Sequence, residues 1–528
     1  MKNKKRYLII VIFILCQTLA FQGPSTIFNE IEINNDKNII TYLSTSNSVV
    51  IEWYCTWGPN ASGTDVAVDS SGNVYVVGGT TNYGLGNANI LLVKYDSLGV
   101  QQWNRTLGGS EWAGGMAVTV DSFDNVYVVG FIEKFGTGYY DILLAKYDSS
   151  GMQQWNRTWG GSEDEIGTAI TADSLDNIYV VGETSSFGAG NVDIALLKYD
   201  NSGVLLWNRT WGGSYYDSGW GVTEDSSDNV YIVGTGNGYM VLVKYDNSGV
   251  QEWNRTWGAG SEIAFAVAVD SSDNAYLVGT TFSFGAGDYD MVLAKYNSSG
   301  VLQWNRTWGG VDEDGGEGLA IDSTNDVYVV GLTYSFGAGN GDMFLVKYDS
   351  SGIQQWNRTW GGTGFDIGLG ISIDLSDNFY VTGHTESLGV GNANMFLVKY
   401  GPDIYDPIIS INSPSPDDKF GDKAPDYEIT IIEPNLESIW YTIDNGITNY
   451  SIIQQTGTIN QTAWDAASYG NITIEFWAKD LAENIGHSEV VVEKVKKKEE
   501  PAIPGYNLFL LIGAIGIITV ISLKKKFN

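Results

Sequence analysis

Acidic side chains recur at corresponding places along this sequence, and they are the residues best suited to chemistry. They are Glu163, Asp164, Glu165, Asp217, Asp312, Glu313, Asp314 and Asp366. Grouped carboxylates bind cations, and a suitably spaced pair performs acid–base chemistry on glycosidic bonds. His384 adds a group that titrates near neutral pH. We therefore expect these residues to share one face of the protein and to form its candidate binding site.

Aromatic residues lie in a repeated Phe/Tyr-Gly-x-Gly pattern that belongs to the same segments, and the candidates are Phe187, Phe284 and Phe336. An acidic face with an aromatic rim would bind a basic peptide or a glycan bridged by a cation. The alternative is that the acids only solvate loops and the glycines only turn the chain. The sequence contains no Ser/His/Asp arrangement, metal-ligand cluster or phosphate loop, so we name no catalytic residue, metal or cofactor. We expect a non-enzymatic protein that acts in binding or adhesion or as an envelope scaffold, with an extracellular polysaccharide hydrolase or lyase as the alternative.

A repeat with a period of about 50 residues must position these side chains. Each copy contains four strand-like runs, and in the second copy they are 116–120, 125–130, 141–147 and 152–159. Asp, Asn and Gly separate the runs, because these residues bond local backbone or tolerate positive φ. Four antiparallel strands per copy are typical of a β-propeller blade.

The phase of the repeat indicates a closed ring. The last copy, 371–400, lacks its fourth strand, whereas 49–58 resembles a fourth strand with no partners before it. Pairing the two removes both exposed sheet edges, which would otherwise promote aggregation. We predict an all-β fold in which the N-terminal strand closes the last blade of a seven-bladed β-propeller.

Three motifs carry a family resemblance: the D-x-x-x-N-x-Y-V-x-G hairpin, the D-x-x-x-x-K-Y strand and the closing Trp. Over residues 49–400 the chain resembles the SBBP-type β-propeller repeat of prokaryotic, here archaeal, cell-surface proteins. The resemblance implies the propeller fold and says little about activity.

Two further repeated features have structural explanations. Each Lys of the Lys-Tyr pair lies in an apolar strand and needs an acidic partner, which we assign to the Asp that opens the first turn of its copy.

The six WNRT copies are also glycosylation sequons, with acceptors Asn104, Asn156, Asn208, Asn254, Asn305 and Asn357. Alternation places Trp and Arg on one strand face and Asn and Thr on the other. Calcium binding at the Asp-rich turns is an alternative to a simple hairpin.

The remaining segments complete the predicted domain organisation. We expect a signal peptide at 1–23, a linker at 24–48, the propeller at 49–401, an Ig-like β-sandwich at 402–495 and a linker at 496–506. An apolar helix at 507–523 is predicted to anchor the protein in the membrane, with 524–528 as cytoplasmic tail. The Pro504-Gly505-Tyr506 segment resembles PGF-type archaeal sorting signals. These features predict a cell-surface location.

The formal net charge of −33 excludes one class of partner. A field of this sign repels nucleic acids and other polyanions. We expect a surface glycan or protein ligand, and contact with the membrane through the C-terminal helix.

Overall fold

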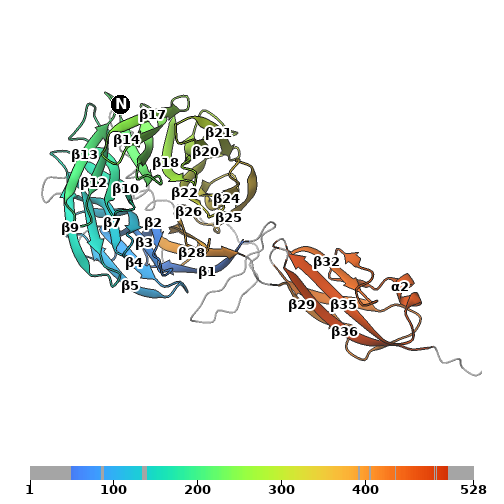
Figure 1. Ribbon diagram of the computed structural model, residues 1–528. Helices are drawn as coiled ribbons and strands as arrows, with labels where there is room; N and C mark the ends of the chain where they lie inside the picture. Colours follow the sequence, from blue (N-terminus) through green and yellow to red (C-terminus); the bar gives the residue numbers. More distant parts are fainter. Residues whose placement is uncertain are drawn as a thin grey trace, which may run out of the picture. The chain divides into compact units, whose positions relative to one another are not determined.

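The computed structural model describes residues 49–84, 88–133, 139–389, 393–402, 406–433, 436–480, 482 and 484–496. The described residues form two compact units, 49–402 and 406–496 (Figure 1). Each unit is almost entirely β-structure.

The first unit contains seven four-stranded antiparallel sheets within its described residues. Sheet one consists of β2 (Ala61–Val68), β3 (Val74–Thr80), β4 (Asn89–Tyr95) and β5 (Gln101–Leu107). Sheet two consists of β6 (Ala113–Val120), β7 (Val126–Glu133), β8 (Tyr140–Tyr147) and β9 (Gln153–Trp159). Sheet three consists of β10 (Glu165–Ala172), β11 (Ile178–Thr184), β12 (Asp193–Tyr199) and β13 (Leu205–Trp211). Sheets four and five are β14 (Asp217–Glu224), β15 (Val230–Gly236), β16 (Tyr239–Tyr245), β17 (Gln251–Trp257); and β18 (Glu262–Val269), β19 (Ala275–Thr281), β20 (Asp290–Tyr296), β21 (Leu302–Trp308). Sheets six and seven are β22 (Asp314–Ile321), β23 (Val327–Thr333), β24 (Asp342–Tyr348), β25 (Gln354–Trp360); and β26 (Asp366–Ile373), β27 (Phe379–Thr385), β28 (Asn394–Pro402) with β1 (Val49–Trp57).

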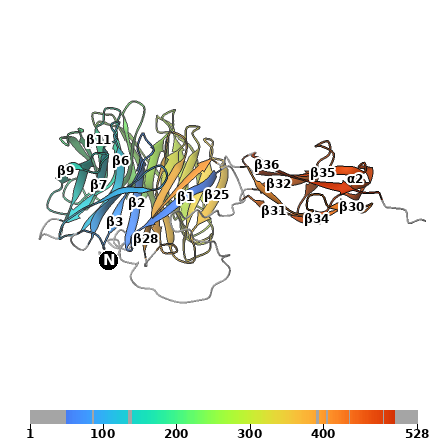
Figure 2. The ribbon, with the colours of Figure 1, turned by 90° about the horizontal axis from the view of Figure 1, so that it is seen from below.

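The sheets surround a common centre, as Figures 1 and 2 show. The first strand of each sheet packs against the first strand of the next, and β2 of the first sheet also packs against β26 and β27 of the last. The fourth strands lie at the opposite edge of their sheets. The arrangement is propeller-like, and its core consists of the apolar second and third strands packed between neighbouring sheets.

The N-terminal strand completes the last sheet, and this prediction is confirmed. Strand β1 pairs antiparallel with β28, with Trp53 opposite Lys399 and Trp57 opposite Met395. Arg358 of the preceding sheet donates from Nη1 to the carbonyl of Val49 at 2.5 Å. Residues more than 300 positions apart are thereby joined, and β28 is not left as an unpaired edge strand.

Aspartate turns link six pairs of adjacent sheets. In each, a Ser of one turn donates its amide and hydroxyl hydrogens to an Asp or Asn in the next turn, as Ser122 does to Asp176 at 2.9 and 3.0 Å. The acceptor has positive φ, near 60° at Asp176, which Asp and Asn tolerate better than most residues. At the junction of the last and first sheets, Leu375 and Gly72 occupy the two positions, so this link is absent.

The closing Trp of each copy packs between neighbouring sheets. The ring of Trp155 lies 5.9 Å from that of Tyr127 within its own sheet and 5.1 Å from the guanidinium carbon of Arg157. It also covers Gly203 in the turn of the next sheet. A β-carbon at Gly203 would lie 3.1 Å from the indole, and φ is +82°, so both packing and backbone conformation favour glycine there.

The second unit contains a three-stranded and a five-stranded sheet around one core, together with a short helix. Its elements are β29 (Ile408–Ser413), β30 (Lys419–Phe420), β31 (Asp426–Ile432), β32 (Leu436–Thr442), β33 (Tyr450–Ile452), β34 (Thr456–Thr458), α2 (Gln461–Ala466), β35 (Gly470–Asp480) and β36 (Ile485–Lys494). Trp464 of α2 is fully buried in this core. The ammonium of buried Lys494 donates to the carbonyls of Trp464 and Ala467 at 2.6 and 2.7 Å, so the end of α2 satisfies the charge that burial would otherwise leave unpaired.

The expected membrane-anchored location is corrected here. No helix among the described residues is long and apolar enough to cross a membrane. The predicted signal peptide, 1–23, the sorting segment at 504–506 and the anchor at 507–523 all lie outside the described residues. Nothing in the structure therefore supports a location at the cell surface through a C-terminal membrane helix.

Candidate functional site

The candidate site lies at one edge of the ring, which we call the upper edge. It is the edge at which the chain leaves the fourth strand of a sheet, enters the first strand of the next, and passes from second to third strands. The structure brings the eight predicted acids to this edge, where they form two groups that differ in accessibility.

Four of the acids are buried and hold loops in place. Glu165, Asp217, Asp314 and Asp366 each begin a first strand and are at most 4% exposed. The carboxylate of Glu165 accepts from the amides of Gly161 and Ser186 at 2.6 and 2.9 Å, and from the Thr184 hydroxyl at 2.9 Å. The other three accept the equivalent amide, from Gly213, Gly310 and Gly362 respectively. Because these contacts use their oxygens, the four residues are structural parts of the loops.

The other acids face outward. Glu163, Asp312 and Glu313 are exposed, and Asp164 is half-buried, with its carboxylate accepting from the Tyr140 amide at 3.1 Å. The loops that carry them are fixed through the backbone, because the amides of Glu163 and Asp312 donate to Ser186 and Ser335 hydroxyls. Fixed loops thus present accessible carboxylates. Their role in binding stays a prediction.

The three predicted aromatic residues pack between neighbouring sheets while remaining about half exposed. Phe187, Phe284 and Phe336 are 44, 47 and 45% exposed. Each ring lies 5.0–5.2 Å from the Trp that ends the fourth strand of the preceding sheet, namely Trp159, Trp257 and Trp308. Aromatic pairs at this distance stabilise the rim and leave an apolar surface beside the exposed acids.

His384 is positioned differently from the acids. It lies within strand β27 and is 7% exposed. Burial lowers the pKa of its imidazole, although the carboxylate of Asp366 acts in the opposite direction. Glu386 lies 3.9 Å from its Nε2. His384 is therefore a neutral core residue near neutral pH.

The lysine pairs confirm the predicted partners in six of the seven copies. The ammonium groups of Lys94, Lys146, Lys198, Lys244, Lys295 and Lys347 lie 3.0–3.8 Å from the turn carboxylates of Asp69, Asp121, Asp173, Asp225, Asp270 and Asp322. Lys399 instead pairs at 2.8 Å with Glu52, which the closing strand β1 supplies. The turn carboxylates also accept local hydrogen bonds, as Asp121 does from Asn125 and Tyr127. Hydrogen bonds and lysines account for these turns without an ion.

One first strand contains a charged residue that the sequence analysis missed. Each first strand has one bulged residue, and Thr168, Trp220, Phe265 and Glu317 occupy this position in sheets three to six. The rings of Trp220 and Phe265 lie 5.6 Å apart, so residues at this level from adjacent sheets meet near the centre. Burial raises the pKa of Glu317 to about 7. The other copies have an apolar residue or Thr at this position, so the acid at 317 was a sequence signal that could have been used.

One group in the second unit has residue types that bind metals. Ligand atoms of Glu475, His487 and Glu489 lie within 4.8 Å of one another on strands β35 and β36. His487 and Glu489 are exposed and Glu475 is half-buried, so solvent reaches the group.

Comparisons with known proteins support the propeller repeat. The profile of the SBBP family, described as a beta-propeller repeat, matches residues 40–86 and 154–188. The Regulatory protein FlaEY of Caulobacter vibrioides is 28% identical over 120 residues, which are 20% of this chain and 13% of that protein.

Three solved structures align with TM-scores below 0.5 and so contribute nothing to the functional argument. The extracellular domain of B. thetaiotaomicron BT3049 aligns with a TM-score of 0.41 at 12% identity, covering 84% of this chain and 57% of that one. The Neurospora crassa Pan2 WD40 domain aligns with a TM-score of 0.45 at 10% identity (68 and 97% covered). A Xanthomonas campestris gluconolactonase aligns with a TM-score of 0.36 at 9% identity (70 and 100% covered).

Proposed function

We propose that this protein is a seven-bladed β-propeller joined to an Ig-like sandwich, and that it acts as a non-enzymatic binding scaffold. Its ligand is a basic protein segment, which binds to the acidic upper edge of the ring. The SBBP match and the propeller-like arrangement support the scaffold part of the proposal.

The separation of charge within the ring carries the proposal. All described lysines and arginines of the first unit lie on the third and fourth strands. The lysines lie at the end of the third strand, at the edge of the ring opposite the upper edge, which we call the lower edge. Arginines such as Arg157 donate to the turn that the next sheet has at this lower edge. The upper edge therefore carries carboxylates without described cations to neutralise them. A cationic ligand gains the largest electrostatic attraction there.

The exposed acids and aromatic rings supply suitable contacts for such a ligand. Glu163, Asp312 and Glu313 can accept charge-assisted hydrogen bonds from Lys or Arg side chains. The neighbouring Phe rings pack against the aliphatic stems of those side chains. The alternative function, hydrolysis or elimination on a polysaccharide, is not favoured, because Glu165 and Asp314 of the predicted set are occupied by loop amides.

Binding of decalysine to the full chain, measured by calorimetry, tests this function. We expect binding that weakens as salt rises from 50 to 300 mM, because the contacts are exposed charges. The triple variant Glu163→Gln, Asp312→Asn, Glu313→Gln should lose at least tenfold in affinity. Glu428→Gln removes an exposed acid of the second unit and serves as the control.

Two results would contradict the proposal. One is equal affinity of the triple variant and the wild-type protein for decalysine. The other is binding of an anionic glycan that requires Ca²⁺ and is abolished by EDTA, with no binding of decalysine. The second result would assign the same acids to a cation-bridged glycan instead.

A further inference from the structure

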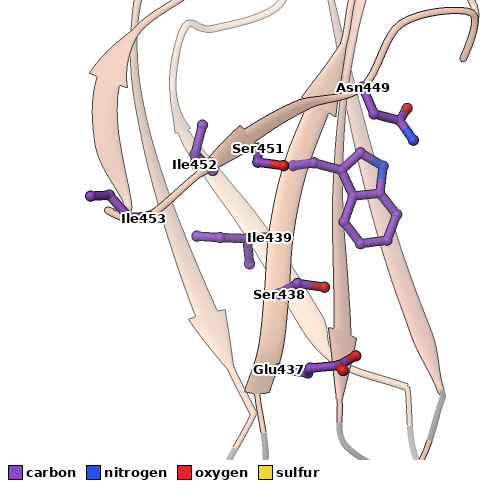
Figure 3. Close-up of a pocket in the computed structure, with 8 residues that line it drawn as sticks. Glu437, Ser438, Ile439, Asn449, Ser451, Ile452 and Ile453 are labelled. Carbon is purple, nitrogen blue, oxygen red and sulfur yellow. The ribbon is translucent and has the colours of Figure 1, made fainter.

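A shallow hollow of about 420 Å³ lies on the five-stranded sheet of the second unit. Figure 3 shows the side chains around it, which come from strands β32 and β33, from the connection between them, and from the residue that follows β33. They are Glu437, Ser438, Ile439, Trp440, Asn449, Ser451, Ile452 and Ile453. This volume falls at the lower end of the range for small-molecule sites, which is roughly 300–1,000 Å³.

Trp440 is the first of three neighbouring rings on strands β32, β35 and β36. Its indole is parallel to that of Trp477, with an interplanar angle of 3° and ring centroids 6.3 Å apart. The His487 ring lies 4.2 Å from Trp477 on the far side, on strand β36. Trp477 therefore lies beside Trp440 on the side away from β33.

The other face of Trp440 borders the hollow because its cross-strand partner is small. In the register of β32 and β33, Trp440 lies opposite Ser451, whereas on β35 it lies opposite Trp477. These residues alternate with Ile439 and Tyr441, whose side chains are buried in the core. Trp440 is only partly buried, so it belongs to the solvent side of the sheet. An aromatic face is thus left accessible as one wall of the hollow.

Polar side chains surround this aromatic wall. Ser438, Asn449 and Ser451 are exposed, and their side chains form no hydrogen bond to residues in the described part of the chain. Glu437 is also exposed and pairs with Lys479 at 3.0 Å, which fixes its carboxylate at the end of the hollow. Two hydroxyls, an amide and a carboxylate are therefore available to a ligand that is also in contact with Trp440.

We propose that the hollow binds a neutral pyranose unit of a glycan. The C–H groups on one side of a pyranose carry weak positive charge and pack on the negative face of an indole. Its equatorial hydroxyls extend sideways, where Asn449 donates and accepts, the serines do both, and Glu437 accepts. A purely apolar ligand would leave these polar groups without partners, and an anionic ligand would meet the Glu437 carboxylate. This site is independent of the function proposed for the ring.

Affinity electrophoresis of the full chain in gels with neutral polysaccharides (mannan, dextran, laminarin and xyloglucan) tests the proposal. We expect at least one of them to retard the wild-type protein. Trp440→Ala should lose at least tenfold in affinity for it, and Asn449→Ala should lose about threefold to tenfold. Trp112→Ala removes a partly exposed Trp from the ring and provides the matched control.

Trp440→Ala removes a ring that packs beside Trp477, so this variant could unfold. In that case Asn449→Ala and Ser438→Ala, which both change exposed side chains, still test the proposal. The proposal is overturned if none of the four neutral polysaccharides retards the protein, or if these variants and the wild-type protein are retarded equally. It is also overturned if adenosine, which stacks on Trp without a pyranose, competes with the polysaccharide as well as the matching free monosaccharide does.

Discussion

The absent link between the last and first sheets offers a direct test of how the ring is held together. Six junctions have a Ser that donates to an Asp or Asn of the next turn, whereas Leu375 and Gly72 replace both partners at the seventh. Leu375 is 93% exposed, so its side chain contributes little. We predict that Leu375→Ser combined with Gly72→Asp introduces the missing link and stabilises the ring.

The backbone at Gly72 has a left-handed conformation that strains most side chains, but Asp tolerates it better than most residues. Its φ of +76° is close to the value near +60° at Asp124, Asp176, Asp228, Asp273 and Asp377. A β-carbon there would make an ordinary contact of 3.6 Å with Ser97. The new aspartate would accept from the amide and the hydroxyl of residue 375, as Asp176 does from Ser122.

The expected gain follows from these two hydrogen bonds. Partly exposed bonds to a carboxylate contribute about 1–2 kcal/mol together. For a cooperative ring of about 350 residues, the unfolding entropy corresponds to roughly 0.7 kcal/mol per degree, so Tm should rise by about 1–3 °C. Differential scanning calorimetry of the two single variants and the double variant measures the coupling between the positions. We expect a coupling of about 0.5–1 kcal/mol, because the Ser hydroxyl gains its partner only when Asp is present.

A matching double-mutant cycle at the intact junction between sheets two and three uses Ser122→Leu and Asp176→Gly. These changes give that junction the same two residue types as the junction between the last and first sheets. They should lower Tm by a similar amount, with Asp176→Asn nearly neutral because Asn325 performs the same role elsewhere. Zero coupling in both cycles would refute the view that these turn contacts join the sheets.

Three further predictions concern ionisable groups within the ring. Glu165→Ala leaves two amides and a hydroxyl without their acceptor and should cost about 3 kcal/mol, lowering Tm by about 4 °C, whereas exposed Glu163→Ala on the same loop should leave Tm unchanged. Glu317 has its pKa raised by burial from 4.5 to about 7, so the folded ring keeps a proton that the unfolded chain loses as pH rises above 4.5. The resulting destabilisation is complete above pH 7, and Glu317→Gln should raise Tm at pH 8 but not at pH 4. Burial raises the pKa of the Cys55 thiol to about 12, so mass spectrometry after iodoacetamide treatment at pH 8 should find Cys55 alkylated only in unfolded protein.

Several features of the fold could be predicted because they depend on local spacing. The alternation in WNRT placed Trp155 and Arg157 on one strand face and Asn156 on the other, and in the structure Trp155 and Arg157 are partly buried whereas Asn156 is exposed. The phase of the repeat predicted the pairing of β1 with β28. The pairing of Lys198 with Asp173 followed from the cost of burying an ammonium group alone. Glycosylation of the exposed asparagines stays a prediction.

The candidate site was harder to predict because accessibility depends on distant residues. Glu163 and Glu165 are two positions apart and equally acidic, yet one is exposed and the other buried. The Thr184 hydroxyl and the Ser186 amide, about twenty residues later, decide this difference. Likewise, Lys399 pairs with Glu52 rather than the turn acid of its own copy, because ring closure brings β1 beside it.

The sequence by itself determined the repeat, its strands and turns, and the order in which the ring closes, since these follow from side-chain alternation and turn chemistry over short distances. Only the tertiary structure decided which carboxylates face solvent, where Glu317 lies, and that Trp440 keeps one uncovered face. Each of these depends on contacts between residues that are distant in the chain. Burial and solvation are properties of those contacts, and identical side chains acquire different chemistry according to what packs around them.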